Sequence, residues 1–138
     1  MRFPVLLVAA LLVTGSAALA FDDAERGRAQ GIVRAQAEAF SHDDADAAYS
    51  YAAPTIRQMF PSAEMFLAMV AHAYPPVYRN QSFEFGEARD DGTTLAQKVR
   101  IVDAAGVPWD ALYTLEKQSD GSWKITGCVL LKAAGQSA

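Results

Sequence analysis

The spacing of apolar residues changes once along this chain, and the change lies at the pair Pro75-Pro76. Before that pair, apolar side chains recur every three to four residues, which is the period of an amphipathic helix. After it, they alternate with polar side chains, which is the period of a strand with one buried face. Helices that precede strands in this way are expected to pack on one face of an antiparallel sheet, so the sequence predicts an α+β fold.

The first part of the chain predicts about three helices and one short helical turn. Asp22 precedes an apolar stripe and is followed three residues later by Glu25, which is a pattern that begins helices. A second helix is expected over residues 45–51 and a helical turn over residues 55–60. Ser62 is expected to cap the third helix, and the proline pair to end it. The expected buried stripes are Ile32, Val33, Gln36, Ala37 and Phe40 in the first helix, and Met65, Phe66, Met69, Val70 and Ala73 in the third.

The second part predicts about four strands joined by tight turns. Asp90-Asp91-Gly92, Ala104-Ala105-Gly106 and Ser119-Asp120-Gly121-Ser122 have the composition of turns. Each strand has one apolar face, so the sheet is expected to be curved and covered by helices on one side only. A β-bulge is expected at Gly127. The side chains predicted to face the helices are Phe83, Phe85, Leu95, Gln97, Val99, Ile101, Trp109, Ala111, Tyr113, Leu115, Trp123, Ile125, Val129 and Leu131.

Residues 1–20 have the composition of a cleaved export signal. Arg2 supplies a positive start, an apolar run of about eleven residues follows, and Ala18-Leu19-Ala20 matches the Ala-x-Ala pattern that signal peptidase recognises. A spanning helix needs roughly 20 apolar residues, so a membrane anchor is the less favoured interpretation. We therefore expect cleavage between Ala20 and Phe21, a single domain over residues 21–138, and a periplasmic or secreted protein.

Charge and composition exclude several classes of partner. Cleavage would leave 118 of the 138 residues and change the formal charge from −4 to −5, because Arg2 leaves with the leader. An acidic chain without a run of Lys and Arg is not expected to bind nucleic acid or anionic lipid surfaces. The sequence contains no glycine-rich phosphate loop and no His or Cys pair at ligand spacing, so neither a cofactor nor a metal is predicted.

Cys128 is the single cysteine of the chain and cannot form an internal disulfide. It follows Gly127 and precedes the apolar residues Val129, Leu130 and Leu131. A free cysteine in such a strand is usually a small core residue, so we expect a buried, inert thiol. An intermolecular bridge and a reactive thiol are the alternatives.

The order of elements, with a last strand that begins Asp120-Gly121-Ser122-Trp123-Lys124-Ile125, resembles the nuclear-transport-factor-2-like superfamily, also called cystatin-like or SnoaL-like. The chain also contains the motifs Asp43-Asp44-Ala45, Tyr51-Ala52-Ala53-Pro54-Thr55-Ile56-Arg57, Phe66-Leu67-Ala68-Met69-Val70, Tyr74-Pro75-Pro76-Val77-Tyr78-Arg79 and Trp123-Lys124-Ile125-Thr126-Gly127-Cys128. With these motifs, nearly all of the chain after the leader resembles an exported bacterial family, domain of unknown function 4864. The resemblance implies a cone-shaped fold, frequent homodimers through the outer sheet face, and often a pocket between helices and sheet. It implies no activity, because superfamily members include isomerases, dehydratases, cyclases and non-catalytic domains.

A pocket between the helices and the sheet is expected because two amides fall on faces that should be buried. Gln36 lies on the stripe of the first helix, and Gln97 lies on the apolar face of the second strand. A buried amide needs a hydrogen-bond partner, so these two predict either a bond to each other or a ligand. The predicted lining residues are Gln36, Tyr49, Met69, Gln97 and Tyr113.

Other polar residues are weaker candidates for a site. Asp103 shares the inward face of the second strand but adjoins a turn, where aspartate usually accepts hydrogen bonds from backbone amides. His42 is expected in a solvated capping loop, and His72 half-buried beside the stripe of the third helix. Arg57 and Arg79 are the cations nearest the helical end, where they would meet an anionic ligand or be solvated.

Three functions remain open from the sequence. The favoured one is an exported domain that binds a small, mostly apolar molecule or a partner protein in or around the pocket, with no identifiable catalytic constellation. The second is a cofactor-free acid–base enzyme of the isomerase or dehydratase type, although no inward aspartate pair accompanies Tyr113. The third is a structural homodimer with a filled cone. A cavity with convergent polar groups favours the first two, and an exposed apolar sheet face favours the third.

Overall fold

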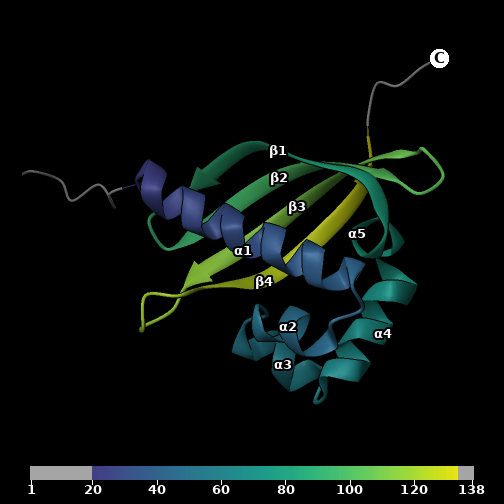
Figure 1. Cartoon of the computed structure of the whole chain (residues 1–138). Helices are drawn as coiled ribbons and strands as arrows, with labels where there is room; N and C mark the ends of the chain where they lie inside the picture. The colour runs from purple at the N-terminus through teal and green to yellow at the C-terminus, as the bar shows by residue number, and fades with distance from the viewer. Residues whose placement is uncertain (1–19, 134–138) are drawn as a thin grey trace, which may run out of the picture.

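The computed structural model describes residues 20–133, in which five helices precede a four-stranded antiparallel sheet (Figure 1). The predicted signal peptide lies outside the described residues except for Ala20. The α+β class and the order of its elements are confirmed. The elements are α1 (Asp23–Ser41), α2 (Ala45–Ser50), α3 (Pro54–Met59), α4 (Ala63–Ala73), α5 (Pro75–Tyr78), β1 (Asn80–Asp90), β2 (Thr94–Asp103), β3 (Pro108–Lys117) and β4 (Trp123–Lys132).

Side-chain caps begin three of the helices. Asp22, Asp44 and Ser62 each accept a hydrogen bond from the backbone N–H three residues on, at 2.8, 3.1 and 3.2 Å. The pair Pro75-Pro76 ends α4, as expected, but it also begins the additional helix α5. Proline is well accommodated in the first turn of a helix, where its missing N–H has no partner to lose. The sequence signal for a helix end was therefore also the signal for a helix start.

The four strands form a meander in the order β1-β2-β3-β4. Each hairpin connection contains a glycine at φ 86°, a left-handed conformation that glycine adopts without strain. α1 lies across one face of the sheet and packs on β2 and β4, whereas α2, α3 and α4 gather beside β4 (Figure 1). The helices thus cover one face only, and the side chains that fill the space between the layers come from that face.

A β-bulge in β4 reverses the side-chain order of its second half. Thr114 pairs with Gly127 while the next residue, Leu115, pairs with Ile125, so Thr126 is the extra residue. The bulge expected at Gly127 is present, but its consequence was missed. The prediction that Val129 and Leu131 face the helices is wrong, because one extra residue moves every later side chain to the other face. Val129 and Leu131 are 56% and 65% exposed, and Cys128 and Leu130 pack against the core instead.

Trp123 anchors one end of the core. Its side chain is 2% exposed, its ring packs edge-on against Phe21 with centroids 4.7 Å apart, and its Nε1 donates to Glu25 Oε2 at 2.8 Å. The indole therefore has both an apolar environment and a partner for its single polar atom, which is the usual condition for burying tryptophan.

The loop between α2 and α3 is bonded to the edge of β4. Ala53 N donates to Ile125 O at 2.8 Å, and Ile125 N donates to Tyr51 O at 2.9 Å. This link holds α3 beside the first half of β4. In the part of the chain that the structure describes, no helix is long and apolar enough to cross a membrane.

Candidate ligand-binding cavity

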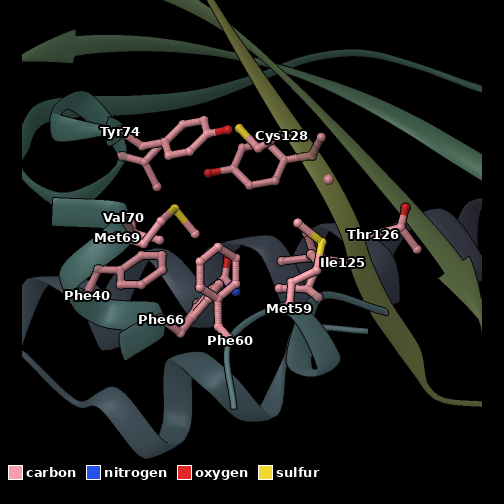
Figure 2. A pocket seen from close by; sticks show the side chains of 15 residues that line it. Phe40, Met59, Phe60, Phe66, Met69, Val70, Tyr74, Ile125, Thr126 and Cys128 are labelled. Atoms are coloured by element: carbon pink, nitrogen blue, oxygen red, sulfur yellow. The ribbon is translucent and has the colours of Figure 1, made fainter. Parts of the chain in front are cut away.

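A cavity of about 270 Å³ lies between the helices and the β3–β4 half of the sheet (Figure 2). It is larger than the roughly 150 Å³ cavity that binds benzene in an engineered protein core. It lies just below the range of about 300–1,000 Å³ that is usual for small-molecule pockets. A molecule of one or two rings is therefore the size class that fits.

The wall is mostly apolar, and α4 supplies its centre. Phe66 is 4% exposed, and its ring lies 5.8–6.2 Å from the rings of Tyr49, Phe40 and Phe60, measured between centroids. Figure 2 shows Phe60 and Phe66 side by side below the cavity, with Met69 above Phe66. The apolar lining residues are Phe40, Ile56, Met59, Phe60, Phe66, Met69, Val70, Val77 and Ile125.

Gln36 contributes a hydrogen-bond acceptor to this wall. Its Nε2 donates to Ala48 O at 3.1 Å, and that bond fixes the amide orientation, because only the nitrogen can donate to a carbonyl. No described residue donates to Gln36 Oε1. Every fully enclosed side-chain nitrogen or oxygen of the described residues has a partner, so Oε1 is not fully enclosed, and Gln36 is one of the residues that line the cavity.

Tyr113 and Cys128 contribute neutral polar groups that stay protonated. Burial raises the pKa of Tyr113 well above its ordinary value, and the neighbouring Cys128 raises it further. Burial also raises the pKa of Cys128 to about 12, against a smaller lowering by the Tyr113 hydroxyl. The Tyr74 ring points toward Cys128 from the junction of α4 and α5 (Figure 2). Near neutral pH the Tyr113 hydroxyl and the Cys128 thiol offer hydrogen bonds but no charge.

Three of the five predicted lining residues, Gln36, Met69 and Tyr113, line the cavity. Tyr49 does not, because its hydroxyl donates to Phe60 O at 2.6 Å and its ring packs against Phe66 with centroids 5.8 Å apart. Gln97 does not either, although it is fully buried as expected. A role in ligand binding remains a prediction for all five residues.

The two buried amides satisfy their hydrogen bonds separately. Gln97 Oε1 accepts from Gln30 Nε2 at 3.1 Å, and its Nε2 donates to the carbonyls of Lys98 and Gly86 at 2.8 and 3.1 Å. The sequence predicted that Gln97 would bond either Gln36 or a ligand. Instead, its amide bonds Gln30 of α1 and two backbone carbonyls of the sheet. Of these two amides, only that of Gln36 keeps an atom without a partner among the described residues.

Sequence reasoning missed Tyr74 and Cys128 among the lining residues. Cys128 was expected to be buried, and it is half-buried against the core, but it was not expected to line the cavity. The register offset at Thr126, which the alternation of Val129 and Leu131 ignored, turns it toward the helices. Tyr74 is the C-cap of α4 and lies in neither a helical stripe nor a strand. No periodic pattern predicts the direction of a side chain at such a position. The turn from α4 into α5 sets the direction of the Tyr74 ring.

The other polar candidates have structural partners or lie in solvent. Asp103 Oδ1 accepts from the N–H groups of Ala105 and Val107 at 2.9 and 2.8 Å, and its Oδ2 accepts from Trp109 Nε1 at 3.0 Å. His42 is exposed at the end of α1, as expected, but His72 is also exposed rather than half-buried. The described residues that line the cavity include no carboxylate, imidazole or amine, and no cluster suited to a metal occurs within residues 20–133.

The two arginines meet aromatic rings and protein oxygens. The Arg57 guanidinium lies over the Tyr49 ring at 4.9 Å. The Arg79 guanidinium lies 4.2 Å from the Tyr78 centroid and 2.9 Å from Asp43 Oδ1. Asp43 also accepts a short hydrogen bond from the Tyr78 hydroxyl. Neither arginine lines the cavity, so the cavity has no cation for an anionic ligand.

Helices followed by a bent antiparallel meander, with a cavity between the two layers, give this chain a nuclear-transport-factor-2-like fold. The chain is similar in structure to an NTF-2 like protein of unknown function from Silicibacter pomeroyi DSS-3, with a TM-score of 0.57 and 19% identity over 82% of this chain and 100% of that one. It is also similar to an NTF-2 like protein of unknown function from Burkholderia xenovorans LB400, with a TM-score of 0.51 and 16% identity over 83% of this chain and 89% of that one.

Within that class, the chain belongs to the family described as Domain of unknown function (DUF4864), whose model matches residues 22–138. Both resemblances expected from the sequence are thereby confirmed. No curated protein matches the chain. At these identities the structural likeness concerns the fold alone, so function has to be argued from the cavity.

Proposed function

We propose that this protein binds a small, uncharged and mostly apolar molecule in the cavity beneath α4, and that it does so in the periplasm or outside the cell. The observation that carries the proposal is the lining itself, which is apolar except for the polar side chains of Gln36, Tyr74, Tyr113, Thr126 and Cys128 and includes no carboxylate, imidazole or amine among the described residues. Burying a charged ligand there would cost several kcal/mol without a compensating partner. An apolar ligand with one hydroxyl or N–H would bury its surface and bond Gln36 Oε1.

A matched series of one-ring probes tests this preference. Toluene, p-cresol and p-toluate have the same ring and methyl group and differ in carrying no polar group, a hydroxyl or a carboxylate. We expect shift changes in ¹H–¹⁵N NMR spectra around the cavity, with p-cresol bound most tightly, toluene more weakly and p-toluate least. Tighter binding of p-toluate, or no binding by any probe, would contradict the proposal.

Two substitutions on one helix separate the cavity from the surface. Met69→Trp places a large ring in the cavity, because Met69 lines it. Met65→Trp is the matched control, one turn earlier on α4. The prediction that Met65 lies on the buried stripe of this helix is wrong, because its side chain is 55% exposed. The proposal requires that Met69→Trp abolish binding of p-cresol and that Met65→Trp retain it. Gln36→Met should remove the advantage of p-cresol over toluene while toluene still binds.

The natural ligand is best sought in the protein as its host makes it. Native mass spectrometry of material purified from the host measures a retained mass and the oligomeric state together. The expected result is an added mass of a neutral molecule that dissociates on denaturation and is absent from Met69→Trp protein.

Self-association through the outer sheet face is a second candidate, supported by an exposed apolar patch. Leu112 and Val129 are direct cross-strand neighbours on that face, and with Leu131 they are 44%, 56% and 65% exposed. The family resemblance implies a second copy of this chain as the occupant. Val129→Glu should convert a dimer to a monomer in analytical ultracentrifugation, and a wild-type monomer at millimolar concentration would exclude this candidate.

A further inference from the structure

The first residue after the predicted cleavage site is bound to a buried carboxylate. Phe21 N donates to Asp90 Oδ1 at 3.1 Å, although the two residues are 69 positions apart in the chain. The Asp90 side chain is 0% exposed. In Figure 1 the start of α1 lies beside the arrowhead of β1, which ends at Asp90.

The two oxygens of Asp90 have different partners. Oδ2 accepts from Arg26 Nη2 and Nε at 2.8 and 3.3 Å. Oδ1 accepts from Phe21 N and from Gly92 N, the latter at 3.2 Å. Hydrogen bonding, first from Arg26 and then from the Phe21 and Gly92 amides, holds the pKa of Asp90 below its ordinary value, so the group is a carboxylate near neutral pH.

The Phe21 side chain also has a fixed partner in the core. Its ring packs edge-on against the buried Trp123, with centroids 4.7 Å apart and planes at 77°. Trp123 is in turn bonded to Glu25 in the first turn of α1. Ala20, the residue before Phe21, is exposed. The position of the Phe21 nitrogen is therefore determined both by its hydrogen bond to Asp90 and by the packing of its ring on Trp123.

We propose that Asp90 is the binding site of the mature α-ammonium group that a signal peptidase creates at Phe21. Hydrolysis of the Ala20–Phe21 amide consumes one water, whose hydroxyl goes to the Ala20 carbonyl carbon and whose proton goes to the Phe21 nitrogen. The new amine then takes up a proton at neutral pH, and the released leader ends in a carboxylate. A neutral amide donor on Asp90 Oδ1 thereby becomes a charged one, without movement of the nitrogen.

Without Asp90, an ammonium group at this place would be unfavourable. The N-terminus of α1 is the positive end of the helix dipole, and Arg26 is a cation in the same cluster. The acidic groups Asp22 and Asp23 are exposed, and the Glu25 carboxylate is paired with Arg28 and Lys117. These groups therefore offset the unfavourable charge less than a buried carboxylate in direct contact does. Asp90 therefore determines whether a positive charge on the Phe21 nitrogen stabilises or destabilises the folded protein. This dependence makes the proposal testable.

Three chains that keep Asp90 isolate the charge at Phe21. They begin at Phe21 with a free amine, at Phe21 with an acetylated amine, and at Ala20 with a free amine. The acetylated chain keeps the N–H donor but not its charge, and the Ala20 chain moves the charge by one residue. In urea unfolding near pH 6.5, we expect the free Phe21 chain to have an unfolding equilibrium constant about tenfold lower than either control, as for other hydrogen bonds to charged groups. Equal constants in the three chains would overturn the proposal.

Neighbouring aspartates provide the matched pair of variants. Asp90→Asn should remove or reverse the difference between the free and acetylated chains. Asp91→Asn should preserve it, because the Asp91 carboxylate accepts from the amides of Thr93 and Thr94 and not from Phe21. A difference that persists in Asp90→Asn would overturn the proposal. If Asp90→Asn does not fold, the three-chain comparison decides alone.

The cleavage itself is tested in the exported protein. The full 138-residue chain is produced in a bacterium with a general secretory pathway, and the intact mass and N-terminal sequence of the periplasmic product are measured. A product that begins at Phe21 supports the proposal. A product that begins at any other residue, or that retains Met1, overturns it.

Discussion

Tyr113 and Cys128 are direct partners across strands β3 and β4, and both side chains line the cavity. Paired residues of an antiparallel sheet point to the same face, so the inward position of Tyr113 requires that of Cys128. The bulge at Thr126 makes this pairing possible, since plain alternation along β4 from Trp123 would turn Cys128 outward. One inserted residue thus places a thiol beside a phenol in the candidate site.

The native Cys128 thiol is expected to react slowly with thiol reagents. Burial raises its pKa to about 12, so only about one molecule in ten thousand carries the reactive thiolate at pH 8. The measurement is the rate of iodoacetamide labelling at pH 8 in native protein and in urea. Labelling of native protein as fast as of unfolded protein would show that the thiol is open to solvent.

Two glycine substitutions are expected to have opposite effects on stability. Gly31 is exposed within α1, and a methyl group there would contact nothing within 4 Å, so Gly31→Ala should stabilise by about 0.5–1 kcal/mol. At Gly127 a methyl group would lie 3.1 Å from Thr114 Oγ1, which accepts a hydrogen bond from Thr126 at 3.0 Å. Gly127→Ala should therefore destabilise by about 1–3 kcal/mol. Urea unfolding of both variants checks the two signs, and a stabilising Gly127→Ala would show that the bulge accommodates a side chain.

Trp123→Ala is expected to cost about 3–5 kcal/mol of unfolding free energy, or to prevent folding, as removal of a large core aromatic does. The residue is 2% exposed and contacts both Phe21 and Glu25. Trp123→Phe keeps a ring in the core and should cost less than the alanine variant. Denaturant unfolding measures both. A loss below about 1 kcal/mol for Trp123→Ala would mean that the side chain contributes little to the core.

Asp103 is expected to contribute to acid sensitivity. Its pKa lies below the ordinary 3.8, first because Trp109 donates to it and then because the Val107 amide does. A lowered folded-state pKa gives stability that is present above pH 3.8 and is lost as the pH falls through the folded value. Asp103→Asn should therefore be less stable at pH 7 and show a flatter loss of stability below pH 4 than wild type. Trp109→Phe, which removes only the first donor, should flatten the curve less, and parallel curves for wild type and Asp103→Asn would contradict the assignment.

The two buried glutamines show how much of the candidate site can be predicted from sequence periodicity. Helical phase and strand alternation placed Gln36 and Gln97 in the core, and both are buried. Periodicity gives the direction of a side chain but not its partner. The Gln97 oxygen accepts a hydrogen bond from Gln30, a residue that no sequence pattern singled out. The Gln36 oxygen has no such donor among the described residues, because the bond to Ala48 O uses only the Gln36 nitrogen.

The sequence by itself determined the fold class, because the change of apolar period at Pro75-Pro76 dictates which segments can bury a face as helices and which as strands. It also determined three helix caps, since a cap is a contact between residues three apart. Tertiary structure alone decided the cavity. The orientation of Cys128 depends on a register offset between two strands, and that of Tyr74 on the turn from α4 into α5. The contact of Phe21 with Asp90 joins residues 69 positions apart. Such relationships depend on how elements meet in space, and no local pattern of residues encodes them.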